Sequence, residues 1–316
     1  RVPTVERFCE EYANAVYAMF GGRKELVHKL MDYLSHLHPT FSVSGEVKLD
    51  YGAKMSATSI AEVLDLPEKL ARDMGNKPIV VAFDEFQDVA ELSKEFPLEK
   101  IFRSCIQAHR NVRYVFLGSK THLMKRMFGD ATRPFYNSAC VLPLDKPPAE
   151  ESSEFVVSRF RDAGMELDGV CAERLLKMSR NIPYYLQELA SGVFEVLARS
   201  NRTSVAETDV EQSAADIVRR NAELYELRMS SFSSAQDLVV RALAAEPKGV
   251  FDEVYRARHA LPVSSTVRAA VKELVEQGVV IDDRAQGAYE LADPFFGRYV
   301  LESPATVFSG SEAIER

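Results

Sequence analysis

The apolar residues of the first 145 positions recur with two spacings, which predict alternating helices and strands. Helical spacing marks residues 3–33, broken at Gly21-Gly22, and then residues 59–74, 99–108 and 122–128. Short apolar runs predict strands at residues 79–83, 112–117 and 139–144. Residues 41–49 alternate around a Ser-Gly pair and predict a hairpin or edge strand. Strands separated by helices are typical of βαβ units, so the fold class is α/β with a parallel sheet.

A second pattern begins after Lys146-Pro147-Pro148, which marks a domain boundary. Residues 150–228 have helical spacing throughout and predict a small all-α domain. Further helices at 237–244, 252–259 and 264–276 precede a hairpin with strands at 279–281 and 289–291, which is the winged helix-turn-helix pattern. Ser264 or Ser265 is expected to cap the third helix. The predicted organisation is a core at 1–145, a helical domain at 146–230, a winged helix at 231–302 and a flexible tail at 303–316.

The stretch 79–87, IVVAFDEFQ, carries the clearest candidate chemistry. Its five apolar residues predict a strand buried on both faces, as in parallel sheets, and Asp84 and Glu85 follow directly. Parallel sheets bind ligands outside the carboxyl ends of their strands. A carboxylate there can hold a Mg²⁺ ion that neutralises phosphate charge, and its neighbour can orient a water molecule. This is the arrangement of a Walker B element; the alternative is an ordinary loop whose Asp84 or Glu85 starts a helix.

Composition narrows the possible functions. The chain has 316 residues, 46% hydrophobic and 27% charged, as in ordinary globular proteins, and no apolar run is long enough to cross a membrane. A net charge of −8 argues against a general nucleic-acid binder, because phosphate binding needs a basic surface. The four cysteines match no zinc spacing and indicate reduced thiols in a cytoplasmic protein.

Five short segments occur in an order and at spacings that are informative together. They are FDEFQ at 83–87, FLGSKTHLM at 116–124, RPFY at 133–136, NIPYYLQ at 181–187 and DPFF at 293–296. With these segments the chain resembles the archaeal-type ATPases in the STAND branch of the AAA+ P-loop NTPases. The resemblance covers nearly the whole chain. It implies an ATPase core, a helical lid and a C-terminal winged helix.

The resemblance also implies roles for particular residues. Asp84 would support Mg²⁺, Glu85 would polarise the attacking water, and Gln87 would position that water or relay the nucleotide state. Ser119, at the end of the next strand, would sense the γ-phosphate, although a serine after Gly118 also suits a helix cap.

Three further positions carry weaker assignments. Arg133 would reach a phosphate, a task for which a guanidinium is better suited than the ammonium group of a lysine. Alternatively, it is a solvated surface arginine, or its only partner is a carboxylate of the lid. Asn181 and Pro183 resemble the lid element that lies near the adenine, with asparagine in place of its glycine, and otherwise read as a turn that starts a helix.

The triphosphate needs a glycine-rich loop of the form GxxxxGK[ST], and the 316 residues contain none. The nearest match, at residues 21–24, lacks the first glycine and follows a helix instead of a strand. The resemblance suggests that Arg1 lies just after the second strand of the sheet. Alternatively, the protein naturally lacks the loop and serves as a scaffold, which would leave an unpaired sheet edge and an uncovered face.

These observations predict a cytoplasmic ATP-driven switch, with Mg-ATP between core and lid controlling the position of the winged helix. Hydrolysis by the chain as it stands is expected to be absent or very slow. The alternative is a non-catalytic adaptor that binds DNA or a protein through the winged helix. Residues 248–298 hold seven Lys or Arg against eight Asp or Glu, which favours intramolecular regulation over DNA contact. ATP and ADP are the expected ligands, and a protein partner or a homo-oligomer stays open.

Overall fold

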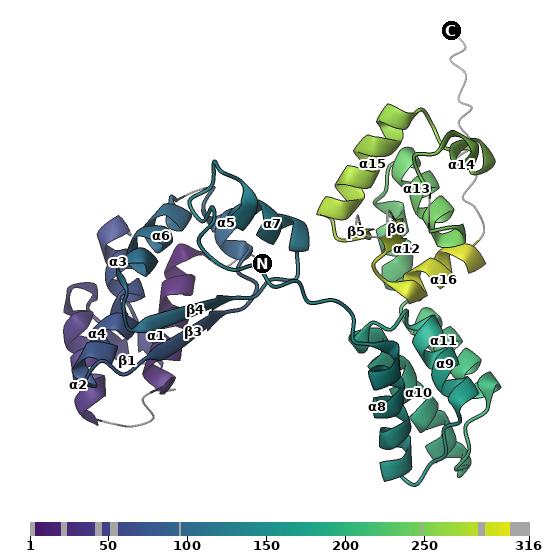
Figure 1. Cartoon of the computed structure of the whole chain (residues 1–316), viewed down its shortest axis with the longest axis horizontal. Coiled ribbons are helices and arrows are strands. Elements are labelled where there is room, and N and C mark those ends of the chain that lie inside the picture. Colours follow the sequence, from purple (N-terminus) through teal and green to yellow (C-terminus); the bar gives the residue numbers. More distant parts are fainter. Residues whose placement is uncertain are drawn as a thin grey trace. The chain divides into compact units, whose positions relative to one another are not determined.

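The computed structural model describes residues 4–19, 24–41, 46–50, 56–94, 96–247, 249–283 and 288–303. The chain forms two compact units, Arg1–Pro143 and Leu144–Arg316 (Figure 1). The tail predicted at 303–316 lies outside the described residues except for Ser303. Among the described helices, none has the length and hydropathy that a membrane span requires.

The first unit contains the predicted alternation of helices and strands. Its strands are β1 (Thr40–Phe41), β2 (Val47–Lys48), β3 (Ile79–Phe83) and β4 (Val112–Phe116). Its helices are α1 (Val5–Met19), α2 (Lys24–Tyr33), the short 3₁₀ helix η1 (Ser35–Leu37), α3 (Ala57–Leu64), α4 (Leu66–Asp73), α5 (Asp88–Leu92), α6 (Leu98–Ala108) and α7 (Thr121–Gly129). The predicted hairpin is confirmed by the antiparallel β1–β2 pair, and β3 and β4 pair in parallel from Ile79↔Val112 to Phe83↔Phe116.

The β3–β4 sheet is covered on one face. Phe83 lies against Tyr12 of α1 and Phe102 of α6, with ring centroids 5.6 Å and 5.3 Å apart. On the opposite face, Val80 is 65% exposed, and Val115 is 43% exposed. The prediction that the strand is buried on both faces is therefore wrong. An apolar run is compatible with two covered faces, but α1 and α6 of the described chain both pack on the face that carries Phe83.

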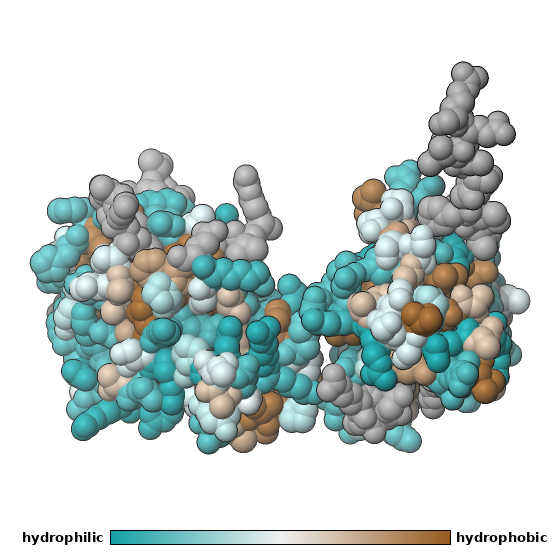
Figure 2. Space-filling view, turned by 90° about the horizontal axis from the view of Figure 1, so that it is seen from above, coloured by the Kyte–Doolittle hydropathy of each residue, from teal (hydrophilic) through white to brown (hydrophobic). Residues whose placement is uncertain are grey.

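The predicted third strand, residues 139–144, is not a strand. Neither β3 nor β4 pairs with it, and Pro143 removes one backbone donor. Its apolar side chains are exposed, Val141 to 60% and Leu142 to 80%. Figure 2 likewise shows hydrophobic residues at the surface of each unit, set among hydrophilic ones. Among the described residues, this apolar segment therefore pairs with neither strand of the sheet, although its composition is that of a strand.

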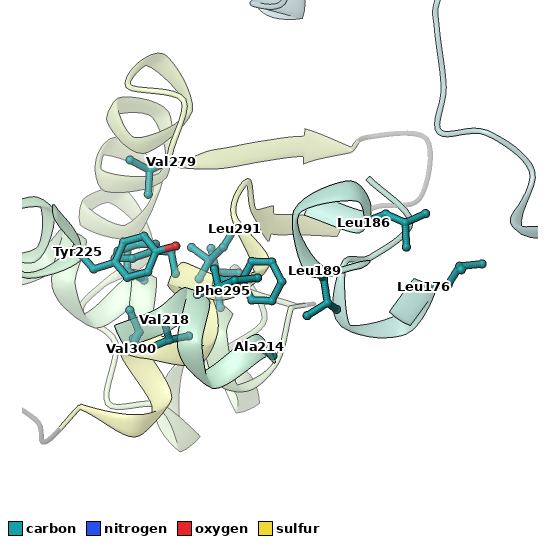
Figure 3. Close-up of a cluster of buried hydrophobic side chains, with 14 of the residues drawn as sticks. Leu176, Leu186, Leu189, Ala214, Val218, Tyr225, Val279, Leu291, Phe295 and Val300 are labelled. Carbon is teal, nitrogen blue, oxygen red and sulfur yellow. The ribbon is translucent and has the colours of Figure 1, made fainter. Parts of the chain in front are cut away.

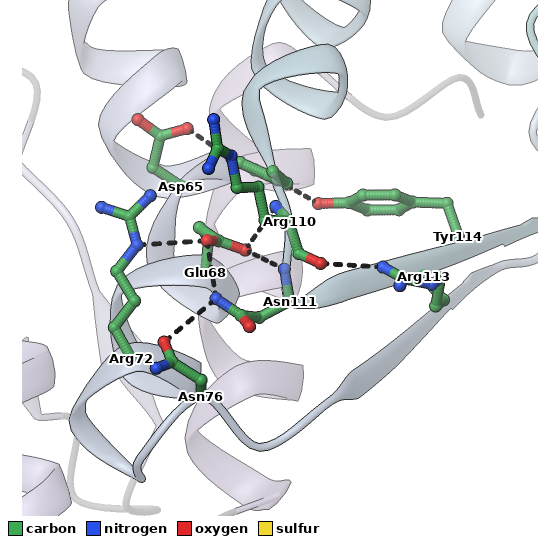
Figure 4. A network of polar contacts seen from close by, with 9 residues as sticks. Asp65, Glu68, Arg72, Asn76, Arg110, Asn111, Arg113 and Tyr114 are labelled. Atoms are coloured by element: carbon green, nitrogen blue, oxygen red, sulfur yellow. Dashed lines mark hydrogen bonds and ion pairs between the residues drawn. The ribbon is translucent and has the colours of Figure 1, made fainter.

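Hydrogen bonds to Glu68 fix the turn that leads into β4. The buried carboxylate of Glu68 on α4 accepts from the backbone N–H of Arg110 (3.1 Å) and from the backbone and side-chain N–H groups of Asn111 (2.8 and 3.0 Å) (Figure 4). The carbonyl of Asn111 then accepts from Ile79 N at 2.9 Å. The start of both strands is thus tied to α4.

The second unit contains the predicted helices followed by the winged helix. Its elements are α8 (Ala149–Asp162), α9 (Gly169–Met178), α10 (Pro183–Ser200), α11 (Glu207–Arg220), α12 (Ala222–Ser230), α13 (Ser234–Ala245), α14 (Glu253–Arg258), α15 (Ser264–Glu276), β5 (Val280–Asp283), β6 (Ala288–Leu291) and α16 (Pro294–Glu302). The antiparallel β5–β6 hairpin follows three helices, as predicted. The expected serine cap of α15 is wrong: its N-cap is Val263, without a side-chain bond, because the helix already includes Ser264.

One hydrophobic cluster runs through the second unit. Figure 3 shows Leu176 and Leu189 of the helical bundle continuing through Phe295 and Leu291 to Val279 beside the hairpin. Arg180, in the turn between α9 and α10, adds a hydrogen bond to the carbonyl of Leu291 at 2.8 Å. The helical bundle and the winged helix therefore share a continuous core.

Candidate functional site

Asp84 and Glu85 leave the sheet beside the end of β4. Leu117 N donates to the carbonyl of Phe83, and Phe86 N donates to the carbonyl of Leu117, both at 2.8 Å. These two bonds hold the segments after β3 and β4 together. Both carboxylates are exposed, as ligand-binding groups at the carboxyl edge of a parallel sheet must be.

The carboxylate of Glu85 is held by two neighbours. Its Oε2 accepts from the Ser119 hydroxyl at 2.7 Å, from Ser119 N at 3.3 Å, and from the side-chain amide of Gln87. The hydrogen bond from Gln87, followed by that from Ser119, lowers the pKa of Glu85 below its usual range. Three residues that the sequence singled out thus meet at one oxygen, and Glu85 is ionised at neutral pH.

The backbone of Glu85 is in the left-handed region, with φ of 49°. Its N–H donates to Asp84 Oδ1 at 2.9 Å, which turns the chain sharply after β3. A non-glycine residue in this conformation costs about 1–2 kcal/mol, and such residues cluster at functional sites. No sequence signal indicated this conformation.

Gln87 and Gly118 are close neighbours next to Glu85. Gln87 is 2% exposed, so its amide is part of the protein interior. A Cβ atom at Gly118 would lie 2.4 Å from Gln87 Oε1. The sequence placed Gly118 at the end of a strand but did not identify this contact, since it joins positions 31 residues apart only after folding.

A groove of about 520 Å³ runs along β3 and ends at the carboxylates. Its lining is mostly apolar and comes chiefly from α1, β3 and α5, including Tyr12, Val80 and Leu92, and it includes Asp84 and Glu85. An apolar groove with a few converging polar groups is the usual form of a small-molecule site.

The donor set at Asp84 and Glu85 fits Mg²⁺ bound together with a phosphate. Within the described residues, no three His, Cys, Asp or Glu side chains are grouped to hold a metal ion. Mg²⁺ commonly takes one or two protein carboxylates and completes its shell with water and phosphate oxygens. One oxygen of each carboxylate already accepts a hydrogen bond, Oδ1 of Asp84 and Oε2 of Glu85, so each side chain offers its other oxygen to an ion.

Arg133 pairs with Glu99 of α6. The Glu99 carboxylate is 4% exposed, and burial raises its pKa although the nearby Arg133 opposes that rise. Two residues further on, Phe135 packs against Phe86 with ring centroids 5.3 Å apart. The structure therefore gives Arg133 a buried partner within the first unit, and not a lid carboxylate.

Asn181 and Pro183 belong to the second unit. Asn181 Nδ2 donates to the carbonyl of Pro147 at 2.6 Å, and its Oδ1 is buried without a partner among the described residues. Arg180 and Asn181 both have left-handed φ values, 52° and 53°. Pro183 opens α10, where its missing N–H costs nothing.

Residues 223–302 match the family model of a probable winged helix domain. Among solved structures, the chain is similar to a Walker-type ATPase of Pyrococcus abyssi, with a TM-score of 0.60 and 19% identity over 94% of this chain and 79% of that one. The ORC2 protein of Aeropyrum pernix in its ADP form gives 0.42 and 14% over 77% and 70%. A RuvB variant of Thermotoga maritima gives 0.39 and 16% over 90% and 96%. No curated protein matches the chain.

The similarity to the Pyrococcus abyssi ATPase is a similarity of fold. At 19% identity it shows a shared fold and not a shared activity. The predicted fold class, an α/β core that shares the fold of that ATPase and is followed by a C-terminal winged helix, is confirmed.

Proposed function

We propose that this protein is a nucleotide-dependent molecular switch of the STAND AAA+ type. Mg-ATP would bind between the α/β core and the helical lid, and its state would control the winged helix. The observation that carries the proposal is the Glu85 carboxylate, held by Ser119 at 2.7 Å beside Asp84 at the carboxyl end of β3. We further propose that the protein acts in the cytoplasm, as its scattered cysteines favour.

Each side chain has a role in this proposal. Asp84 holds Mg²⁺, which would neutralise charge on the phosphates. Glu85 would accept a proton from the attacking water. Ser119 would sense the γ-phosphate by forming a hydrogen bond to it or to that water. Arg133 would contact a phosphate only after leaving Glu99. Asn181 and Pro183 would line the adenine side from the lid.

The test is the Mg²⁺ dependence of ATP binding, measured by calorimetry on the full gene product. Wild-type protein should lose about tenfold in affinity for ATP when EDTA removes Mg²⁺, which corresponds to about 1.4 kcal/mol. Asp84→Asn should abolish this difference. Asp162→Asn, an exposed carboxylate on α8, should keep it. ATP binding that is absent, or equally tight with and without Mg²⁺ in the wild type, would overturn the proposal.

DNA binding through the winged helix is the alternative, and the face of α15 speaks against it. Arg268 stacks over the ring of Phe251, 4.8 Å from its centroid. Lys272 lies 3.9 Å from Glu276 on the same helix. Arg268 is thus engaged within the domain, whereas Lys272 is 77% exposed and its ion pair is a weak surface one, and Arg284 lies outside the described residues. We expect no salt-dependent gel shift of duplex DNA at low micromolar protein; such a shift, weakened by Arg268→Ala, would favour the adaptor.

A further inference from the structure

The buried amide of Gln87 has an unusual environment. Its Nε2 donates to Glu85 Oε2, while its Oε1 is buried and has no hydrogen-bond partner among the described residues. Leaving a buried acceptor without a partner costs about 1–3 kcal/mol. The Gln87 amide thus keeps its hydrogen bond to Glu85 although its Oε1 pays the free energy of an unpaired buried acceptor. We infer that the packing around Oε1 holds the amide in this orientation.

Gly118 leaves the space in which the end of the Gln87 side chain lies. A Cβ atom at this position would lie 2.4 Å from Gln87 Oε1 and 2.7 Å from Met124 Cγ, both far inside van der Waals contact. The backbone cannot easily retreat, because Leu117 N bonds to the carbonyl of Phe83 and Ser119 N bonds to Glu85. With both neighbours fixed, a side chain at position 118 would require the side chains of Gln87 and Met124 to move.

We propose that Gly118 is a positioning residue of the candidate ATPase site. The space left by its missing side chain admits the Gln87 amide, and Gln87 and Ser119 together hold one oxygen of Glu85. All three described donors act on Oε2, which leaves Oε1 for a water molecule. Gln87 thus acts through Glu85 and not on the water itself, since it is 2% exposed. The catalytic meaning of this arrangement rests on the proposed function; the arrangement itself does not.

The experiment follows the side-chain amide protons of Gln87 by NMR in the full protein, without nucleotide. In wild type they should exchange with solvent at least about tenfold more slowly than those of the exposed Gln277. Gly118→Ala should remove this protection, as should Glu85→Ala, which deletes the acceptor. Gly129→Ala is the matched control, because a Cβ there meets nothing within 4 Å, and it should change nothing.

A second variant separates Gln87 from Met124. In Gly118→Ala with Met124→Ala, the clash with Met124 is relieved and the clash with Gln87 remains, so protection should still be lost. This variant also serves if Gly118→Ala alone fails to fold. Fast exchange in wild type, or protection retained in a folded Gly118→Ala protein or regained with Met124→Ala, would overturn the inference.

The proposed function fails by a different result. If ATP binding proves absent or independent of Mg²⁺, the switch is wrong while the amide protection can still be present. If turnover is found, Gly118→Ala should lower it no further in a Gln87→Ala background, because both changes release the same bond. A purely structural role of Gly118 would instead make the two losses add.

Discussion

Replacing Glu68 by alanine is expected to lower the free energy of unfolding of the first unit by about 2–3 kcal/mol, because several donors lose a buried charged acceptor at once. The carboxylate is 4% exposed and bonds to Arg72 Nε at 3.1 Å as well as to three N–H groups of Arg110 and Asn111. The loss is measured by amide hydrogen exchange of β3 and β4, whose pairing begins beside Asn111.

The matched control is Glu11→Ala. Glu11 also pairs with an arginine four positions away on one helix, Arg7 at 2.7 Å, but the two side chains are 60% and 71% exposed. Exposed pairs of this kind contribute about 0.3–0.5 kcal/mol. Equal effects at Glu11 and Glu68 would show that the network of Figure 4 adds nothing beyond a surface ion pair.

The same carboxylate predicts a pH dependence. Burial acts to raise the pKa of Glu68, but the hydrogen bonds from Asn111, Arg72 and Arg110 outweigh it and lower the pKa. A carboxyl whose folded pKa is depressed contributes stability above its unfolded pKa, about 4.3, and loses it as the pH falls through the folded value. The stability difference between wild type and Glu68→Gln should therefore shrink below about pH 4.3 and be constant between pH 6 and 8.

Much of the first unit could be predicted from local sequence. The parallel pairing of β3 and β4 follows from two apolar runs separated by a helix, and the meeting of Glu85 with Ser119 follows because the carboxyl ends of neighbouring parallel strands share an edge. The hairpin and the helices of the winged helix were likewise readable from spacing and turn residues.

The wrong predictions concern which segments pack or pair beside a given strand or side chain, and the spacing of apolar residues along the sequence does not encode this. The sequence of β3 is the same whether one face is covered or two, so the exposure of Val80 could not be read from it. Residues 139–144 have the composition of a strand, but composition does not show whether a segment pairs with another strand. Arg133 forms an ion pair with Glu99, which lies 34 positions away in the sequence, and no local sequence pattern indicates such a partner.

The details of the site depend on close approach. The left-handed turn at Glu85 and the burial of Gln87 under Gly118 arise from packing between two loops. The sequence did contain one signal of this contact, namely Gly118. A glycine at the end of a strand and next to a candidate site residue can mark the close approach of another backbone or side chain.

Replacing Glu85 by glutamine is expected to lower ATP turnover by about 10²- to 10⁴-fold and to leave the Kd for Mg-ATP within about twofold. Glutamine keeps the shape of the side chain and can still contact Ser119, but it has no charge with which to accept a proton from water. The measurement is phosphate release together with nucleotide binding, on the full gene product. Glu91→Gln serves as control, since Glu91 of α5 pairs at the surface with Lys94, which follows that helix.

The combination of the two measurements decides what Glu85 does. Lost turnover with intact binding assigns it to the chemical step, whereas lost binding would mean that the carboxylate holds the metal and that Asp84 and Glu85 exchange roles. Unchanged turnover would contradict a general base at this position.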